Sequence, residues 1–346
     1  SSVVDVKTRE GDYNDYHGLF SIGLLDGRFQ LEGPIWKDKT SFNIGLRRSW
    51  IDVLAEPVCL LISSLEESKF RVKYAFWDLN ANVTHKFSDD NKLSLNIYGG
   101  RDAAKLIAGN DREPVDTYHS TYMTQWGLEW GNLVTSLDWD YKFAPNHETS
   151  LKAYYTMYDS MFGLNDEGRT IIKDHNDYSL ISDEEYFTSS GNKSRTSDLG
   201  LKADFGYRPA ENHHIRYGST FKYHFYNPVS YSVKNGKMNG EVTYDEDKSQ
   251  SAPRQSFESD LYIEDEMSLT DWFTANVGLR YAAIATEGKL YHSIEPRAAL
   301  RFQCGDYTDL KLSYSEMSQN SHLISSTYIQ LPTSFWMPST PKIAPS

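Results

Sequence analysis

The sequence predicts an all-β fold, an antiparallel transmembrane β-barrel that is incomplete in this chain. Three observations predict it: tracts of alternating apolar and polar residues, short and long connections in turn, and tryptophans near strand ends. Between Trp77 and Phe143 the alternation occurs three times, and a period of two indicates a strand with one apolar and one polar face. Strands of about eleven residues are roughly twice the usual globular length and match a tilted transmembrane β-strand.

Composition agrees with strands that are polar on one face. Aromatic residues make up 14% of the chain, whereas apolar residues make up 39% and the mean hydropathy is −0.59. That balance is poor in aliphatic residues for a large soluble core. The net charge of −13 and the lack of a Lys/Arg block argue against nucleic acid as a partner. The two cysteines lack the spacing of a metal site, so we expect no metal and no cofactor.

Alternation along the chain predicts about thirteen strands. They lie near residues 16–25, 28–35, 40–49, 73–87, 92–100, 132–143, 149–161, 196–207, 214–226, 256–268, 272–284, 295–303 and 309–317. Asp26-Gly27 is expected to close the first hairpin. The other tight turns are expected at residues 36–39, 88–91, 144–147, 208–212, 268–271 and 305–308.

Long connections are expected at the opposite ends of these strands. We expect outer loops at residues 50–72, 101–131, 162–195 and 227–255. Short turns on one side and long loops on the other are typical of a transmembrane barrel. Trp36 and Trp50, at opposite ends of one strand, would lie roughly 35 Å apart, which suits two interfacial aromatic girdles. Core aromatics of a soluble β-sandwich or propeller are the alternative.

Several short motifs follow one another along the chain. They are residues 1–11 (Ser-Ser-Val-Val-Asp-Val-Lys-Thr-Arg-Glu-Gly), 31–35, 46–50, 76–81, 294–300 and 331–338. The first resembles the last plug strand of TonB-dependent outer-membrane receptors, and the next two resemble that family's first barrel strands. Residues 76–81 and 294–300 resemble barrel strands of members that carry a carboxypeptidase-like regulatory domain before the plug, and residues 331–338 resemble a late outer loop of the same group.

The resemblance implies a barrel of about 22 strands filled by a plug. It divides the chain into the end of a plug domain, residues 1–11, and a partial barrel, residues 12–346, with about thirteen of the expected strands. We therefore expect a fragment of a longer protein. The implied partners are the lipid bilayer, the TonB complex through the part before Ser1, and a surface lipoprotein in members that take up glycans or peptides. The implied location is the bacterial outer membrane, with many passes.

The polar positions of the alternating strands are expected to face the barrel lumen or the plug. They include Arg47, Asp78, Asp138, Asp140, Asp204 and Glu264. The acidic wall could contact the plug and pass a hydrophilic or cationic ligand, or it could be an ordinary solvated interior. We expect Arg47 to pair with carboxylates of the plug.

Ligand contacts are expected in the outer loops, where aromatic residues and carboxylates occur together. The candidates are Tyr122, Trp126, Asp174, Asp177, Tyr178, Glu184 and Tyr186. Such a mixture suits a sugar or a calcium ion, although a solvated charged loop has the same composition.

The function implied by the resemblance is import of a scarce nutrient, a siderophore, cobalamin, glycan or peptide, with energy from TonB. No nucleophile motif occurs in the sequence, so we expect no enzyme activity. Two alternatives stay open. One is an outer-membrane hydrolase with a site at Asp174, His175 and Asp183, and the other is a passive porin or adhesin.

Overall fold

The computed structural model describes residues 8–66, 68–111, 117–238, 241–247, 252–305, 307–324 and 335–346. Residues 1–7, which hold most of the plug-like motif, and residues 331–334 of the last motif lie outside the described residues. Within the described part, the chain consists of strands and one α-helix, α1 (Ile51–Leu65).

The strands follow one another along the chain with few other elements. They are β1 (His17–Ile22), β2 (Asp26–Trp36), β3 (Thr40–Ser49), β4 (Ser68–Ser88), β5 (Asn91–Asp111), β6 (Tyr118–Ala144), β7 (His147–Lys173), β8 (Leu180–Ala210), β9 (His213–Met238), β10 (Glu241–Asp247), β11 (Arg254–Thr270), β12 (Phe273–Thr286), β13 (Lys289–Gly305), β14 (Thr308–Ser315), β15 (Ser321–Ile324) and β16 (Phe335–Pro338).

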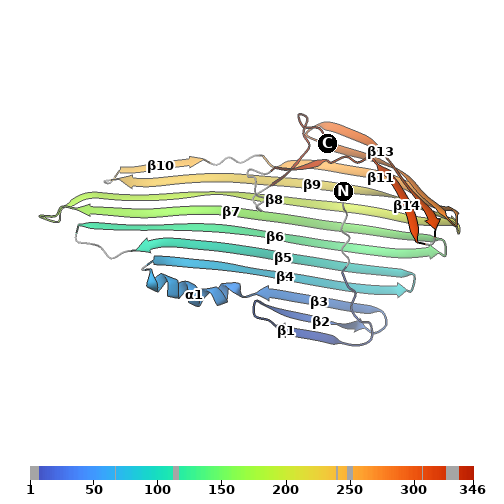
Figure 1. The fold of residues 1–346 in the computed structure, drawn as a ribbon, viewed down its shortest axis with the longest axis horizontal. Coiled ribbons are helices and arrows are strands. Elements are labelled where there is room, and N and C mark those ends of the chain that lie inside the picture. The colour runs from blue at the N-terminus through green and yellow to red at the C-terminus, as the bar shows by residue number, and fades with distance from the viewer. Residues whose placement is uncertain are drawn as a thin grey trace.

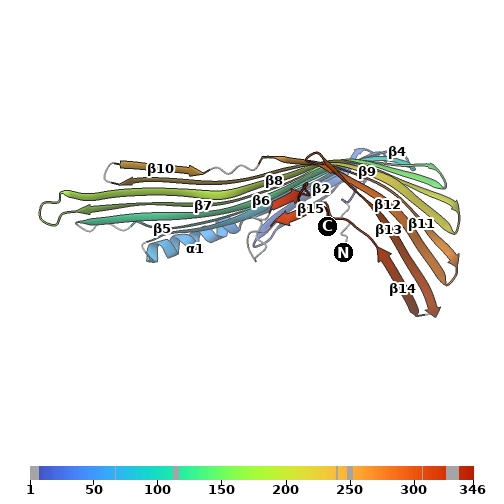
Figure 2. The same cartoon turned by 90° about the horizontal axis from the view of Figure 1, so that it is seen from above.

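Fourteen of the described strands form one antiparallel sheet, in the order β1 to β9 and then β11 to β14, with β10 beside β9 (Figure 1). β15 and β16 form a separate pair. Among the described strands, β1 and β14 are the two edges of the large sheet, so it is open. Figure 2 shows it as a curved, twisted wall with the C-terminal end on the concave side. The predicted all-β, incomplete antiparallel barrel is confirmed.

The short turns are confirmed, but the predicted outer loops are wrong. Residues 101–111 continue β5, 118–131 begin β6, 162–173 end β7, 180–195 begin β8, 227–238 end β9, and 241–247 form β10. The alternation changes phase near Gly131: Trp126, Leu128 and Trp130 are apolar at even positions, whereas Leu133 and Leu137 are apolar at odd positions. Backbone pairing continues through this change of phase, so the alternation alone cannot show where these strands end.

In the segment predicted as a loop at 50–72, residues 51–65 form α1 and residues 68–72 begin β4. The helix contains four leucines, which favour helical structure, and Asp52 in the first turn suits the positive end of the helix dipole. The helix lies along the N-terminal half of β4, where no described strand pairs with β4 on that side (Figure 1). The Ser63 hydroxyl accepts from the Phe70 N–H at 3.0 Å and donates to its C=O at 3.1 Å, so α1 covers the free strand edge.

The first hairpin also differs from the prediction. It closes at residues 23–25, with a hydrogen bond from the Gly23 N–H to the Asp26 C=O at 2.8 Å, and Asp26-Gly27 already belongs to β2. At the β12–β13 hairpin, by contrast, Glu287 (φ 47°) and Gly288 (φ 79°) both adopt the left-handed conformation of a tight hairpin turn.

The two faces of the sheet differ in chemistry. We call the face on which residues 8–16 lie the inner face, and the opposite one the outer face. Large apolar side chains are exposed on the outer face, among them Trp77, Leu95, Leu137, Leu201, Phe221 and Leu279. Buried polar side chains lie on the inner face, among them Asn82, Thr84, Ser94, Thr220, Asp260 and Glu295. An exposed apolar surface of this extent indicates contact with another apolar phase.

In the described part of the chain, no helix is long and apolar enough to span a membrane.

Candidate functional site

Strand register aligns charged residues across the inner face. Lys92 lies opposite Asp140, Asp140 opposite Ser150, and Ser150 opposite Asp204. The row continues through Gly218, Tyr262, Arg280 and Glu295. Cross-strand neighbours of this kind have Cβ atoms about 5 Å apart, so acidic and basic groups lie within reach of one another across eight strands.

The N-terminal segment, residues 8–16, is held on this face by charged contacts. The Lys92 ammonium bonds the Glu10 carboxylate at 2.7 Å, and the Arg9 guanidinium pairs with Glu32 of β2. The Thr8 hydroxyl reaches Asn96. Contacts to β2 and β5 therefore fix the path of the segment at two points.

Close packing adds to these ion pairs. A β carbon on Gly11 would lie 2.0 Å from the Phe42 carbonyl oxygen, so only glycine fits at this position. The Tyr13 carbonyl accepts from the Asp38 N–H at 3.0 Å, and the Lys86 ammonium lies 3.7 Å from the Tyr13 ring centre. The segment is thus a packed part of the wall.

The surroundings of Glu10 favour its charged form. Partial burial raises the pKa of the carboxyl, but hydrogen bonds from Lys92 and from the Tyr13 hydroxyl (2.8 Å), together with the Lys92 charge, lower it below 4.5 overall. The ion pair between the segment and β5 is therefore intact at neutral pH.

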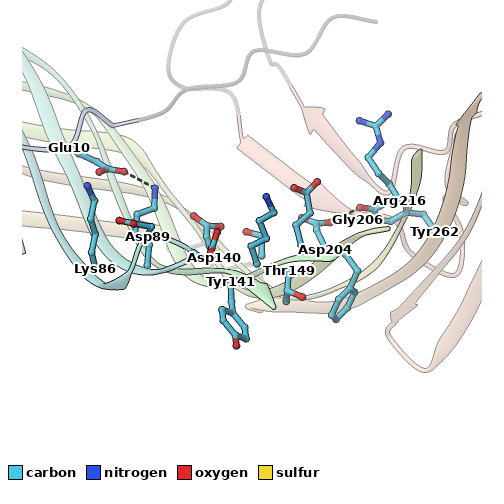
Figure 3. Close-up of a pocket in the computed structure, with 16 residues that line it drawn as sticks. Glu10, Lys86, Asp89, Asp140, Tyr141, Thr149, Asp204, Gly206, Arg216 and Tyr262 are labelled. Carbon is cyan, nitrogen blue, oxygen red and sulfur yellow. Dashed lines mark hydrogen bonds and ion pairs between the residues drawn. The ribbon is translucent and has the colours of Figure 1, made fainter. Parts of the chain in front are cut away.

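A hollow of about 590 Å³ lies beside the segment and is lined by Glu10, Lys92, Asp140, Glu148, Asp204 and Arg216, among others. In Figure 3, Glu10 and Arg216 point toward the concave side, whereas Tyr141 points away from it. The walls carry six carboxylates and four cations. Such a surface suits contact with a polar partner of mixed charge.

A second hollow, of about 430 Å³, continues along the same face and shares Tyr262 with the first. Its lining includes four cations, Lys202, Lys222, Arg280 and Arg297. Arg280 bonds Asp260 at 3.0 Å and Glu295 at 3.1 Å, and the Glu295 side chain is only 1% exposed. Pairing of this kind stabilises the charged groups on the inner face.

His224 of β9 lies between two carboxylates on the inner face. Its Nδ1 is 2.7 Å from Asp198 Oδ1 and its Nε2 is 3.4 Å from Glu258 Oε2. Lys222 also approaches Glu258, at 3.5 Å. Among the described residues, no group of three or more His, Cys, Asp or Glu side chains is arranged to hold a metal ion.

The structure places the acidic residues that we expected in the lumen on the inner face. The Asp138 carboxylate accepts from Asn96 at 2.7 Å and pairs with Lys152 at 3.1 Å. The other predicted acidic residues lie on the same face: Asp78, opposite Arg47; Asp140, opposite Lys92; Asp204, bonded by Tyr262 at 2.6 Å; and Glu264, paired with Arg216 at 2.8 Å. Each lies beside a partner from a neighbouring strand.

Arg47 pairs with a residue of the wall in the described structure, and its expected pairing with carboxylates of the plug stays a prediction. Its Nη2 lies 2.6 Å from Asp26 Oδ2, and its guanidinium lies 4.6 Å from the Phe76 ring centre. The pairing of β2 with β3 brings Arg47 and Asp26 to the same end of the hairpin, although the two residues are far apart in the sequence. Arg47 therefore ties two strands together.

The residues expected to bind a ligand divide into two groups. Tyr122 and Tyr186 lie on either side of Gly168 across β6, β7 and β8, and with it line a hollow of about 350 Å³. Trp126 and Glu184 lie on the same face of β6 and β8, and the Trp126 ring lies 5.9 Å from Phe162.

The second group, Asp174, Asp177 and Tyr178, lies in the turn between β7 and β8. Asp174 accepts from the Asn176 N–H at 2.7 Å, and Asp177 accepts from the Ser179 N–H at 2.9 Å. Hydrogen bonds from the Ser179 side chain and from the Ser179 N–H lower the pKa of Asp177. Both carboxylates therefore shape their own turn.

The hydrolase alternative needs a histidine beside a carboxylate at the outer rim. Asp183 is bound by Arg169 through two hydrogen bonds of 2.9 and 2.8 Å, and Asp174 binds its own turn. In the described residues, no hydrogen bond joins His175 to either carboxylate. This geometry gives the alternative no support.

Sequence reasoning missed the residues that hold the N-terminal segment. Arg9, Glu10 and Lys92 are single charges without a motif, and only the fold brings them together. The alternation does contain one usable signal, because Lys92 shares a phase with Asn96, which puts it on the polar face.

Comparison with known proteins agrees with this architecture. Residues 68–339 match the family model described as TonB dependent receptor-like, beta-barrel. No curated protein matches the chain. Among solved structures, the ferric-catecholate import receptor Fiu from K12 E. coli is 7% identical, with a TM-score of 0.24, over 85% of this chain and 71% of Fiu.

Two further structures are similar at the same level. The ferric yersiniabactin uptake receptor FyuA from Yersinia pestis is 9% identical, with a TM-score of 0.22, over 89% of this chain and 62% of FyuA. The RagAB peptide importer is 7% identical, with a TM-score of 0.21, over 87% of this chain and 52% of that chain. The family match extends from β4 to β16, and on this basis the chain belongs to the TonB-dependent receptor-like β-barrel family.

Proposed function

We propose that this chain forms part of the barrel wall of an outer-membrane receptor that imports a scarce nutrient with energy from TonB. The observation that supports it best is the division of the sheet into an apolar outer face and a polar inner face that holds residues 8–16. A lipid-facing wall needs the first face, and a lumen that contains a plug needs the second.

In this proposal the membrane surrounds the part of each strand next to the short turns. We call this part the belt. In the longest strands, β4 to β9, it covers residues 77–88, 91–101, 132–144, 147–158, 196–210 and 213–226. The extension is the remainder of β4–β9 and projects outside the cell. Trp36, 60% exposed, and Trp77, 47% exposed, lie near the two boundaries of the belt and would anchor it in the interfaces.

Residues 1–11 are the end of the plug domain in this proposal. The ion pairs of Arg9 and Glu10 would fix the point at which the plug joins the wall. The hollows of mixed charge on the inner face would contact the plug body. The TonB complex would act on the part of the protein that precedes Ser1.

The extension would bind the ligand first. Tyr122 and Tyr186 offer exposed rings on one face, which suits a glycan, a siderophore, cobalamin or a peptide with aromatic groups. A surface lipoprotein would join the complex if the ligand is a glycan or a peptide.

Topology and transport can be tested in the full-length protein in cells. In a Cys304→Ser background, Asn176→Cys in the β7–β8 turn should react with a membrane-impermeant thiol reagent, and Asn146→Cys in the short β6–β7 turn should react only after lysis. Nutrient uptake should stop when TonB is deleted. Equal labelling of both cysteines in intact cells would contradict the topology, and TonB-independent uptake would contradict the transport mechanism.

A further inference from the structure

Two lysines lie directly opposite each other on the outer face of β4 and β5. Lys73 pairs in register with Lys105, and both side chains are exposed. They share the outer face with Trp77. Lys73 lies four positions before Trp77 in an unbroken strand, and every second side chain of a strand points to the same face. Like charges directly opposite in a sheet repel each other and destabilise the pair.

The neighbouring acids do not relieve this repulsion. Glu56 of α1 is bound by Arg71 at 3.1 Å, and Glu129 of β6 is bound by Arg101. Within the described residues, neither Lys73 nor Lys105 forms an ion pair. The two lysines therefore form a site of uncompensated positive charge between two occupied ion pairs.

The surface beside the lysines is open. The next position in the row is Gly127 of β6, and a β carbon there would meet no atom within 4 Å. The row continues through Gly163 and Gly191. An anionic group can thus approach both ammonium groups without meeting a side chain on that side.

The height of the pair suggests the source of the anion, and this step depends on the proposed function. Lys73 lies four residues beyond Trp77, so at ~3.3 Å per residue and the usual tilt it stands about 10 Å above the interfacial tryptophan. Headgroups of the outer leaflet lie at that height. β4 and β5 run side by side here (Figure 1), continuous with the apolar outer face below.

We propose that Lys73 and Lys105 bind phosphate groups on the saccharide headgroup of an outer-leaflet glycolipid. One phosphate between the two ammonium groups replaces a repulsive contact with two attractive ones. Charge complementarity and continuity with the lipid-facing surface favour a membrane lipid over a soluble anion.

The test uses the full-length receptor in nanodiscs of phosphatidylcholine that contain either lipid A or its dephosphorylated form. Native mass spectrometry gives the Kd for lipid A. The K73A/K105A variant should bind lipid A about ten- to thirty-fold more weakly, because each lysine near an anionic surface contributes about 1 kcal/mol. The matched control K37A/K311A removes two exposed lysines at the opposite rim and should bind as the wild type does.

The outcomes separate this inference from the proposed function. Equal binding by K73A/K105A and wild type, or equal binding of the dephosphorylated lipid, would overturn the lysine site while leaving the receptor intact. Inorganic phosphate that competes fully at millimolar concentration would show a soluble anion site and would also overturn it. If the wild-type receptor does not insert into the bilayer at all, the membrane placement itself is wrong.

Discussion

Belt and extension of β6 are parts of one continuous strand with opposite distributions of polarity. In the belt, Leu137 and Trp139 lie on the outer face and Asp138 on the inner face. In the extension, Gln125 and Glu129 lie on the outer face, and the apolar residues Trp126, Leu128 and Trp130 lie on the inner face. The comparison indicates that the surroundings of the strand change along its length while its hydrogen bonding does not.

The largest expected effect contrasts two arginine–carboxylate pairs, one in the belt and one in the extension. Replacing Arg280 in the belt with Met leaves the Glu295 carboxylate, 1% exposed, without its main cation. We expect a loss of about 3 kcal/mol, the lower end for a broken buried ion pair, because the Arg280 side chain is 26% exposed. Urea unfolding of the full-length protein in detergent micelles gives the value.

The matched variant is Arg169→Met in the extension, which breaks the pair with Asp183. That arginine is 50% exposed, so water and salt replace the lost contact and the unfolding midpoint should hardly move. A larger loss for Arg169→Met than for Arg280→Met would show that the extension carries a tighter polar network than the belt.

The second largest expected effect comes from a charge on the outer face, which should destabilise the belt more than the extension. Leu137→Arg places a guanidinium at the middle of the belt and should cost about 2 kcal/mol when unfolding is measured in lipid vesicles. Ile107→Arg makes the same change on the outer face of the extension and should cost less than about 1 kcal/mol. Equal costs would contradict the position of the membrane boundary between these residues.

This contrast also explains what the sequence could predict. In the belt, the proposed membrane placement puts water and an apolar phase on opposite sides of the sheet. Leu93, Leu95 and Ile97 alternate with polar residues there, so the strands can be recognised from the sequence. In the extension, the phase changes at Gly131 and that signal fails. The contacts of Glu10 with Lys92 join residues 82 apart in sequence, and no local pattern encodes such a pair.

A smaller loss of stability is expected at the edge of the extension, where α1 covers β4. Ser63→Ala removes the hydroxyl that bonds the backbone of Phe70 at the free edge of β4. We expect a loss of about 1 kcal/mol and faster hydrogen exchange of the Phe70 amide. Ser64→Ala, on the same helix, is the control and should change neither quantity. No change in exchange for Ser63→Ala would mean that water caps this edge equally well.

The smallest effect is a pH dependence where the N-terminal segment meets the belt. Because Lys92 and Tyr13 depress the folded-state pKa of Glu10 below 4.5, the ion pair stabilises the docked segment fully above pH 4.5. That contribution is lost as the pH falls below this value and the carboxylate takes up a proton. Hydrogen exchange of residues 8–16 should therefore quicken below pH 4.5, after correction for the intrinsic rate, whereas Glu10→Gln should show fast exchange without this step. Asp177, whose pKa is lowered by its own turn, reports on acidification in the extension, so a step in residues 174–179 alone would place the sensitive contact there and not at Glu10.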